Sequence, residues 1–364
     1  MIELPAIIRL AAGCSSELPD YLKGAAVLLL CGRHSLAKVE QEVIPQLESS
    51  GKRVETVIIP PELPLQVICD TVTRYRNCGI SDIIGWGGGS AMDGAKALAP
   101  LLTAPESPEK YFYGEAKLPP RRINLILLPT TAGTGAEVTP NAVLRDEKSG
   151  IKQSLRGSNM QADAALIDPL LLRGTPAKVM AASGFDAFTQ AVESFVSNRA
   201  DTLTRGMSLM GAQLIFSELA AGCRGEERAF EALSRGTVLG AMAFAQCGLG
   251  AVHGIAHPLG SVLNLGHGAA CASLLVPVME MNRIRVPEIY ADLARGLGFA
   301  DCGKLCAAVK ELLRELGLPE KLASYGLSRE KFPFIVKNCR SGSMRCNPCE
   351  LSDAEVELLL EELL

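Results

Sequence analysis

Three of the four histidines in this 364-residue chain fall within fifteen positions, at His253, His257 and His267. His253 and His257 are four residues apart, so a helix through this apolar, glycine-containing stretch would place both rings on one face. Imidazole is the commonest metal ligand and also transfers protons near neutral pH. A lone buried histidine is usually structural, whereas this concentration favours a metal-binding or catalytic site.

A metal needs more donors than two imidazoles, and the segment 183–193, SGFDAFTQAVE, offers them. Asp186 and Gln190 are again four residues apart and would share one face of a helix. Glu193 is the competing acid in this segment, and it is as well explained by a place at the surface or in helix packing.

A run of glycines offers a different chemistry. Gly87, Gly88, Gly89 and Ser90 follow the apolar strand expected at 82–85 and open a helix. Glycines let backbone N–H groups approach a pyrophosphate, and the positive end of the helix adds to the attraction. The spacing departs from G-x-G-x-x-G, so a purely structural tight turn is the alternative.

A second polar loop, PTTAGTGAEVT at 129–139, follows the strand expected at 123–128. Ligands of open α/β sheets bind at the carboxyl edge, where this loop would also lie. The loop carries the hydroxyls of Thr130, Thr131, Thr134 and Thr139. The alternative is a loop whose hydroxyls satisfy its own backbone.

The elements that must position these residues change character along the chain. The first part alternates helix-length segments, such as 36–49 and 65–77, with short apolar runs at 27–31, 55–59, 82–85, 123–128 and 164–167. That alternation predicts a doubly wound parallel sheet, a Rossmann-like α/β dinucleotide-binding domain, over 1–175. Long helical patterns follow at 177–196, 201–221, 227–244 and 291–316, and a short amphipathic acidic helix is expected at 353–364. They predict an all-α metal-binding and catalytic domain over 176–364.

Composition excludes several classes of partner. A net charge of −4 with scattered basic residues argues against nucleic acid. No stretch approaches the roughly 20 apolar residues of a membrane span, and the N-terminus lacks a signal-peptide pattern. The twelve cysteines are then expected as free thiols in the cytoplasm. A single C-x-x-C at 346–349 lacks the second pair that a structural zinc site needs.

Five motifs in order, GGGSAMDGAK, PTTAGTGAEVT, FDAFTQAVE, HGIAHPLG and GHG, span essentially the whole chain. Together they resemble the iron-containing (group III) alcohol dehydrogenase family, most of all the propanol and ethanol dehydrogenases of bacterial diol or ethanolamine breakdown. The resemblance implies hydride transfer between NAD or NADP and a short-chain primary alcohol or its aldehyde. It also implies a homodimer or higher homo-oligomer, in the cytoplasm or within a bacterial microcompartment.

The resemblance also implies roles for individual residues. Gly87–Ser90 would hold the pyrophosphate with help from Asp93. Thr130 and Thr131 would lie at the adenine side, and the residues nearer the nicotinamide would be Thr134, Thr139 and Lys152. His257 would relay the alcohol proton. The metal, Fe(II) with Zn or Mn as alternatives, would be bound by Asp186, Gln190, His253 and His267.

Two positions depart from the family pattern. Gln190 replaces the usual histidine ligand, and an amide oxygen is a harder and weaker donor. We therefore expect weak or partial metal occupancy and a disadvantage for zinc. Gly32 occupies the place where many NAD-preferring relatives carry an aspartate, and Arg33 beside it can pair with a 2′-phosphate. This favours NADP or dual cofactor use.

Two alternatives remain open from the sequence. A dehydroquinate synthase-like enzyme or a polyol(-phosphate) dehydrogenase could share the architecture, although the clustered basic residues expected for a phosphorylated substrate are missing. The Gln190 change also allows a catalytically silent nucleotide-binding homologue, but all three clustered histidines remain.

Overall fold

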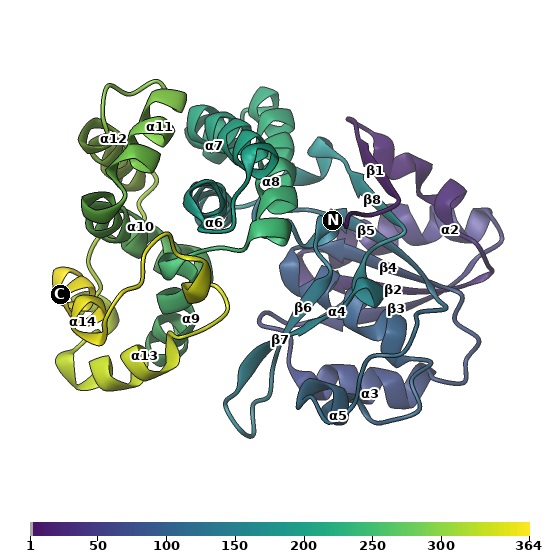
Figure 1. Ribbon diagram of the computed structural model, residues 1–364. Coiled ribbons are helices and arrows are strands. Elements are labelled where there is room, and N and C mark those ends of the chain that lie inside the picture. Colours follow the sequence, from purple (N-terminus) through teal and green to yellow (C-terminus); the bar gives the residue numbers. More distant parts are fainter. Residues whose placement is uncertain (1–2) are drawn as a thin grey trace. The chain divides into compact units, whose positions relative to one another are not determined.

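The computed structural model describes residues 3–364, and the chain divides into two compact units. One unit consists of Met1–Thr131 and Gly135–Arg173, and the other of Ala132–Thr134 and Gly174–Leu364. Figure 1 shows the strands in the first unit and helices in the second.

A six-stranded, fully parallel sheet forms the centre of the first unit, in the order β1-β8-β5-β4-β2-β3. The strands are β1 (Ile7–Leu10), β2 (Ala26–Gly32), β3 (Arg53–Ile59), β4 (Asp82–Gly87), β5 (Asn124–Pro129) and β8 (Ala164–Ile167). The parallel sheet expected from the sequence is confirmed, with all five anticipated strands. β1 was not anticipated, because it has four residues and pairs on one side only.

Both faces of this sheet are covered, which explains its continuous apolar strands. Leu28 of β2 packs into a core formed with α3 (Leu65–Tyr75) and α4 (Gly89–Leu101). Its neighbour Leu29 packs into a second core with the helical segment 36–49. Successive strand residues point to opposite faces, so each face needs its own apolar set.

The order of the strands reverses at β2, which has β3 on one side and β4 on the other. In open parallel sheets, ligands bind outside the carboxyl ends of the strands at such a switch point. The segments that leave the sheet there are Arg33–Ser35 after β2 and Gly88 with the start of α4 after β4.

The remaining elements of the first unit are short. The segment 36–49 is helical throughout, with a π-helical turn between α1 (Leu36–Lys38) and α2 (Ile44–Ser49). α5 (Pro108–Phe112) follows α4. An unanticipated antiparallel hairpin is formed by β6 (Asn141–Arg145) and β7 (Lys152–Arg156).

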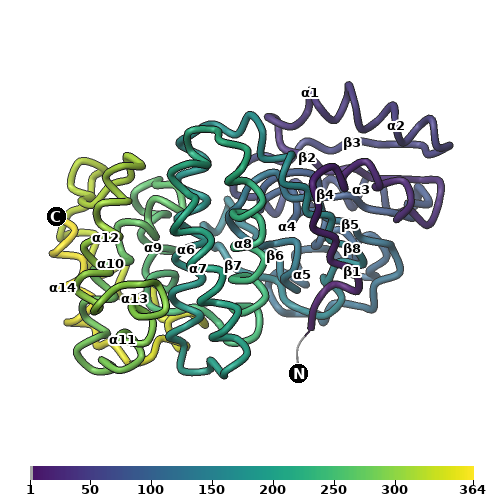
Figure 2. Tube along the Cα trace, turned by 90° about the horizontal axis from the view of Figure 1, so that it is seen from above, coloured from purple at the N-terminus to yellow at the C-terminus, as the bar shows by residue number. Residues whose placement is uncertain are grey.

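The described part of the second unit is helical, as expected. Its helices are α6 (Ala177–Val196), α7 (Thr202–Cys223), α8 (Glu227–Cys247), α9 (Ala251–Leu263), α10 (His267–Arg285), α11 (Pro287–Gly296), α12 (Cys302–Glu315), α13 (Phe332–Asn338) and α14 (Asp353–Glu362). α6, α7 and α8 lie side by side in both views (Figures 1 and 2). The single helix expected at 291–316 is wrong, because the chain breaks between α11 and α12, where Gly298 has a φ of 84°.

Within residues 3–364, no individual helix combines the length and the apolar composition of a membrane span. Among the helices of the described chain, α8 and α9 pass that test as a pair, and they are bent by 100° at the break between them.

Candidate metal centre and dinucleotide-binding edge

Three helices of the second unit bring a carboxylate and two imidazoles together. Asp186 lies in α6, His253 in the first turn of α9, and His267 at the first position of α10. Asp186 Oδ1 is 3.2 Å from His253 Nε2 and 3.8 Å from His267 Nε2. Asp186 and His253 are buried, whereas the His267 side chain is 30% exposed. The three residues predicted from widely separated motifs therefore meet in one cluster.

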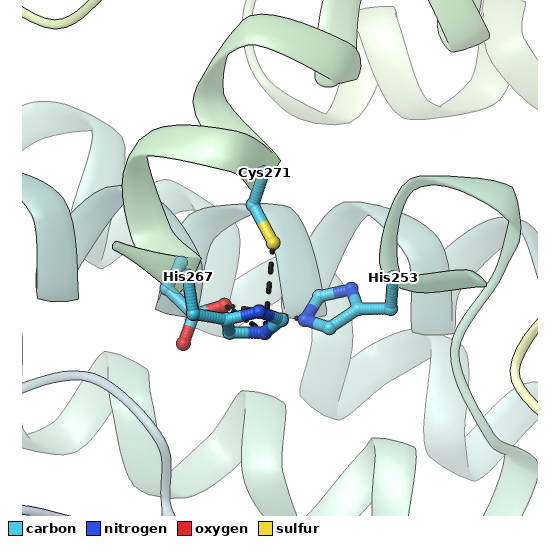
Figure 3. A group of neighbouring side chains, drawn as sticks. His253, His267 and Cys271 are labelled. Atoms are coloured by element: carbon cyan, nitrogen blue, oxygen red, sulfur yellow. Dashed lines mark hydrogen bonds and ion pairs between the residues drawn. The ribbon is translucent and has the colours of Figure 1, made fainter. Parts of the chain in front are cut away.

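Cys271 belongs to the same cluster, and sequence reasoning missed it. It lies one turn after His267 on α10, and its Sγ is 3.7 Å from His267 Nε2. Figure 3 shows the thiol and the His253 ring both directed at His267. One donor atom from each of Asp186, His253, His267 and Cys271 lies within 4.8 Å of all the others. The sequence held one indication of this, because Cys271 follows His267 by four residues and a helix would place both on one face.

Gln190 lies one turn after Asp186 on α6 and is buried. Its Oε1 has no hydrogen-bond partner among the described residues. A buried acceptor without a donor costs about 1–3 kcal/mol, and a nearby cation would offset that cost. The carboxylate, two imidazoles and thiol of the cluster are donors that fit a divalent transition metal, and the orphaned oxygen on the same helix as Asp186 agrees with a cation there.

Glu193, also on α6, orients one of the imidazoles. It is 3% exposed, and its Oε2 lies 2.5 Å from His253 Nδ1. Its Oε1 accepts a hydrogen bond of 2.6 Å from the backbone N–H of Val252. When Nδ1 donates to a carboxylate, Nε2 presents its lone pair, which is how carboxylates support metal-binding histidines. The surface interpretation of Glu193 is therefore wrong.

His257 is the third histidine of the motif, one turn after His253 on α9. Its ring stacks on that of His267, with centroids 5.1 Å apart and planes at 19°. His253 meets His267 edge-on, with centroids 5.3 Å apart. His257 thus contacts a candidate ligand without belonging to the donor cluster.

Two glycines permit these close approaches. A Cβ on Gly268 would overlap the carbonyl oxygen of Ala182, so glycine allows the start of α10 to lie directly against α6. A Cβ on Gly250 would lie 2.7 Å from Glu193 Oε1. Close packing against α6 therefore explains why glycines stand beside the histidines in these two motifs.

The charges in the cluster stabilise one another. Burial alone would raise the pKa of Asp186, but His267 and His253 outweigh it and hold this pKa below its ordinary value. Burial would lower the pKa of His253, but Cys271 and Glu193 raise it well above the usual value. Burial opposes ionisation of Cys271, yet both imidazoles lower its pKa. A bound cation would take the place of the imidazole protons.

In the first unit, the glycine turn lies at the switch point of the sheet. β4 ends at Gly87, whose φ of 153° favours glycine, and a Cβ there would lie 3.0 Å from Ala91 Cβ and 3.6 Å from Gly32 N. α4 begins at Gly89, and within the described chain no side chain caps its N-terminus. Its first N–H groups are therefore available to an anion.

The second predicted loop lies beside this turn. The Thr130 N–H donates to the Gly87 carbonyl oxygen at 3.0 Å, and a Cβ on Gly88 would lie 3.4 Å from Thr131 Oγ1. The structure therefore brings the glycine turn and the start of the threonine loop to one edge. Thr134 belongs to the short segment 132–134 that clusters with the second unit.

Other predicted cofactor residues already have partners. Asp93 pairs with buried Lys96 at 2.9 Å and accepts from the Val143 N–H at 3.0 Å. Lys96 also donates to Thr139 Oγ1 at 3.2 Å, so Thr139 is held in the same buried network. Lys152, on β7, pairs with Glu62 at 3.2 Å.

Glu137 is a buried acid in the threonine loop. Burial raises its pKa to about 7, although the charge of Lys96 acts in the opposite direction. Its Oε2 has no hydrogen-bond partner among the described residues.

Arg33 lies just beyond β2 and is exposed. Its guanidinium makes no hydrogen bond or ion pair with any residue of the described chain. A charged group of this kind at the switch point can receive an anionic ligand.

The family model for iron-containing alcohol dehydrogenases matches residues 5–169, and the C-terminal model of the same family matches residues 180–364. The chain belongs to the iron-containing alcohol dehydrogenase family. It is an oxidoreductase that interconverts alcohols and aldehydes with a nicotinamide cofactor and a divalent metal.

The probable alcohol dehydrogenase EutG of Escherichia coli is 36% identical over 263 residues, a match that covers 71% of this chain and 66% of that protein. The lactaldehyde reductase of E. coli is 32% identical, with 77% of this chain and 75% of that protein covered. Among solved structures, sulfoacetaldehyde reductase from Bifidobacterium kashiwanohense in complex with NAD+ has a TM-score of 0.93 at 25% identity, covering 100% of this chain and 98% of that chain.

Proposed function

We propose that the second unit holds the metal and that the first unit binds the dinucleotide, to interconvert short-chain primary alcohols and aldehydes. The observation that carries the proposal is the convergence of Asp186, His253 and His267 from three helices. Gln190, with its orphaned oxygen, is the fourth ligand that we propose. The proposed dinucleotide residues are Gly87, Gly88, Gly89, Ser90, Asp93, Thr130, Thr131, Thr134, Thr139 and Lys152.

A divalent metal, Fe(II) above all, supplies Lewis-acid polarisation of the substrate oxygen when bound, and the nicotinamide exchanges the hydride. The N–H groups at the start of α4 bind the pyrophosphate and fix the cofactor. Glu193 holds the His253 ring so that Nε2 faces the other donors. His257, stacked on His267, takes the hydroxyl proton during alcohol oxidation and returns it during aldehyde reduction.

The name of one relative, lactaldehyde reductase, supports a small substrate. The cellular setting of this chain is part of the same proposal. We place a homodimer or higher homo-oligomer in the cytoplasm, with residence in a bacterial microcompartment as a narrower form of it.

The direct test is consumption of NADH and of NADPH with propanal or butanal, with and without added Fe(II). Metal-loaded wild-type protein should oxidise at least one cofactor, and Asp186→Asn should lose this activity together with the metal. Exposed Glu231 on α8 provides the control variant Glu231→Gln, which should behave as wild type. Metal-loaded wild-type protein that consumes neither cofactor with either aldehyde would contradict the proposal.

For the cofactor, we propose use of NADP or of both dinucleotides, supported by Gly32 and unpartnered Arg33. A hydrogen bond to a charged group contributes about 1.5–3 kcal/mol, so Arg33→Ala should raise KM for NADPH by roughly 10- to 100-fold. KM for NADH should not change. The control Arg53→Ala removes an exposed arginine at the start of β3, where the amino ends of the strands lie, away from the carboxyl ends that Arg33 follows. A large wild-type preference for NADH would contradict this proposal.

A further inference from the structure

We propose that the Cys271 thiolate is a ligand of the metal, so that this chain binds it through a carboxylate, two imidazoles and one sulfur. The inference rests on the metal site of the proposed function and adds a donor to it. Cys271 is buried on α10, one turn after His267 and with no disulfide partner.

The separations of the donor atoms support a single shared ion. Four ligands at about 2.0–2.3 Å from one tetrahedral ion lie roughly 3.3–3.8 Å from one another. The separations here are 3.2 Å between Asp186 Oδ1 and His253 Nε2, 3.8 Å from that oxygen to His267 Nε2, and 3.7 Å from this nitrogen to Cys271 Sγ. These values span the tetrahedral range, and all four donor atoms lie within 4.8 Å of one another, so small rotations of the side chains suffice.

The direction of the thiol agrees with this arrangement. Figure 3 shows Sγ pointing from α10 toward the His267 ring, on the side that also faces His253. A cysteine that only filled space in α10 would not need to face three ligand-type groups. Among the described residues, this is the one group of histidine, cysteine and acidic side chains close enough to hold a metal.

Charge favours the thiolate as well. Asp186 and an ionised Cys271 together neutralise a divalent ion, whereas Asp186 with neutral Gln190 and two imidazoles leaves one positive charge in a largely buried site. An uncompensated buried charge is costly. The thiolate is also a soft donor, which favours zinc relative to Mn(II) or Fe(II).

This donor changes what Gln190 implies. Weak occupancy and poor zinc binding are expected when the amide of Gln190 replaces an imidazole ligand and no additional donor is present. With Cys271 present, the site has four strong donors without Gln190, so Cys271 takes the place of Gln190 as fourth ligand and the substrate oxygen would add as a fifth donor. We therefore infer tight metal binding, with zinc able to compete with Fe(II) for the site.

Cobalt(II) substitution tests the sulfur bond without any need for turnover. The Co(II)-loaded wild-type protein should show a near-ultraviolet thiolate-to-cobalt charge-transfer band. Gln190→Ala should keep this band, and so should Cys302→Ala, which removes another buried cysteine of the second unit. Cys271→Ser and Cys271→Ala should lose it. A wild-type protein that binds Co(II) without the band would overturn the inference, and this result does not depend on how any variant folds.

Zinc retention gives a second readout. Loss of a supporting outer residue weakens metal binding by about 10–100-fold, so loss of the thiolate ligand should weaken zinc by more than roughly 100-fold in chelator competition. Zinc affinity in Cys271→Ala equal to that of wild type, with unchanged circular dichroism, would also overturn the inference. A cobalt–sulfur band without alcohol oxidation would contradict only the proposed function, and alcohol oxidation without that band would contradict only this inference.

Discussion

The substitution Glu193→Gln tests whether the carboxylate beneath His253 supports metal binding. In the native protein, Oε2 lies 2.5 Å from His253 Nδ1, and Oε1 accepts from the Val252 N–H at 2.6 Å. A glutamine has one acceptor oxygen for these two donors. Either the ring N–H or the backbone N–H must then face an NH2 group inside a buried site.

The magnitude follows from that geometry. One buried donor left without a partner costs about 1–3 kcal/mol. Part of this cost destabilises the His253 tautomer with its proton on Nδ1, which is the tautomer whose Nε2 lone pair can bind the metal. Loss of such a supporting group weakens metal binding by about 10–100-fold, which corresponds to about 1.4–2.7 kcal/mol. The two estimates agree, so Glu193→Gln should lower metal affinity by one to two orders of magnitude.

The assay is competition between the protein and a chelator of known affinity for zinc, followed for wild type, Glu193→Gln and Glu231→Gln. Urea unfolding with excess chelator measures the metal-free stability, which should fall by about 1–3 kcal/mol in Glu193→Gln alone. Zinc affinity of Glu193→Gln within experimental error of wild type would refute the reasoning, because the carboxylate would then contribute nothing to the ring orientation.

Three further predictions follow from the site and its supports. Gly268→Ala should destabilise the protein by about 1–3 kcal/mol or more, since its Cβ would overlap α6, whereas Gly266→Ala, where a Cβ meets nothing within 4 Å, should be nearly neutral in urea unfolding. Equal effects would contradict this packing argument. Burial raises the pKa of Glu137 from 4.5 to about 7. The stability of the fold that depends on a protonated Glu137 is therefore fully present below pH 4.5, and it is lost as the pH rises through 7. Glu137→Gln should therefore gain up to about 3 kcal/mol relative to wild type between pH 4.5 and about pH 8, and parallel stability curves would contradict it. Finally, His257→Ala should lose turnover more than metal content and His267→Ala should lose metal; identical metal and rate profiles in the two variants would show that these roles are assigned wrongly.

Sequence patterns predicted the fold well where burial dictates the residue types. The strand at 164–167 and the helix at 177–196 have the predicted bounds. The misses are elements that local pattern does not specify. The hairpin of β6 and β7 mixes polar and apolar residues and depends on contacts such as that of Val143 with Asp93 on α4. The break between α11 and α12 depends on one glycine inside a helix-like pattern.

For the candidate site, the sequence identified residues that are rare or regularly spaced, and tertiary structure supplied the rest. The motif spacing singled out His253 and His267, which the fold brings to Asp186. The sequence offered no comparable reason to assign Glu193 and Cys271 to the site, because an acid in a helix and a cysteine in an apolar segment are both common. Their roles follow from the angles at which α6, α9 and α10 meet, which no local pattern encodes.

The most direct test of a metal-dependent, nicotinamide-linked site is a crystal structure of metal-loaded protein with bound dinucleotide, recorded at the absorption edge of the metal. We predict one anomalous peak within bonding distance of Asp186, His253 and His267, and pyrophosphate density at Gly87–Ser90. An anomalous peak at other residues in fully loaded protein, or a dinucleotide bound away from the start of α4, would contradict the account.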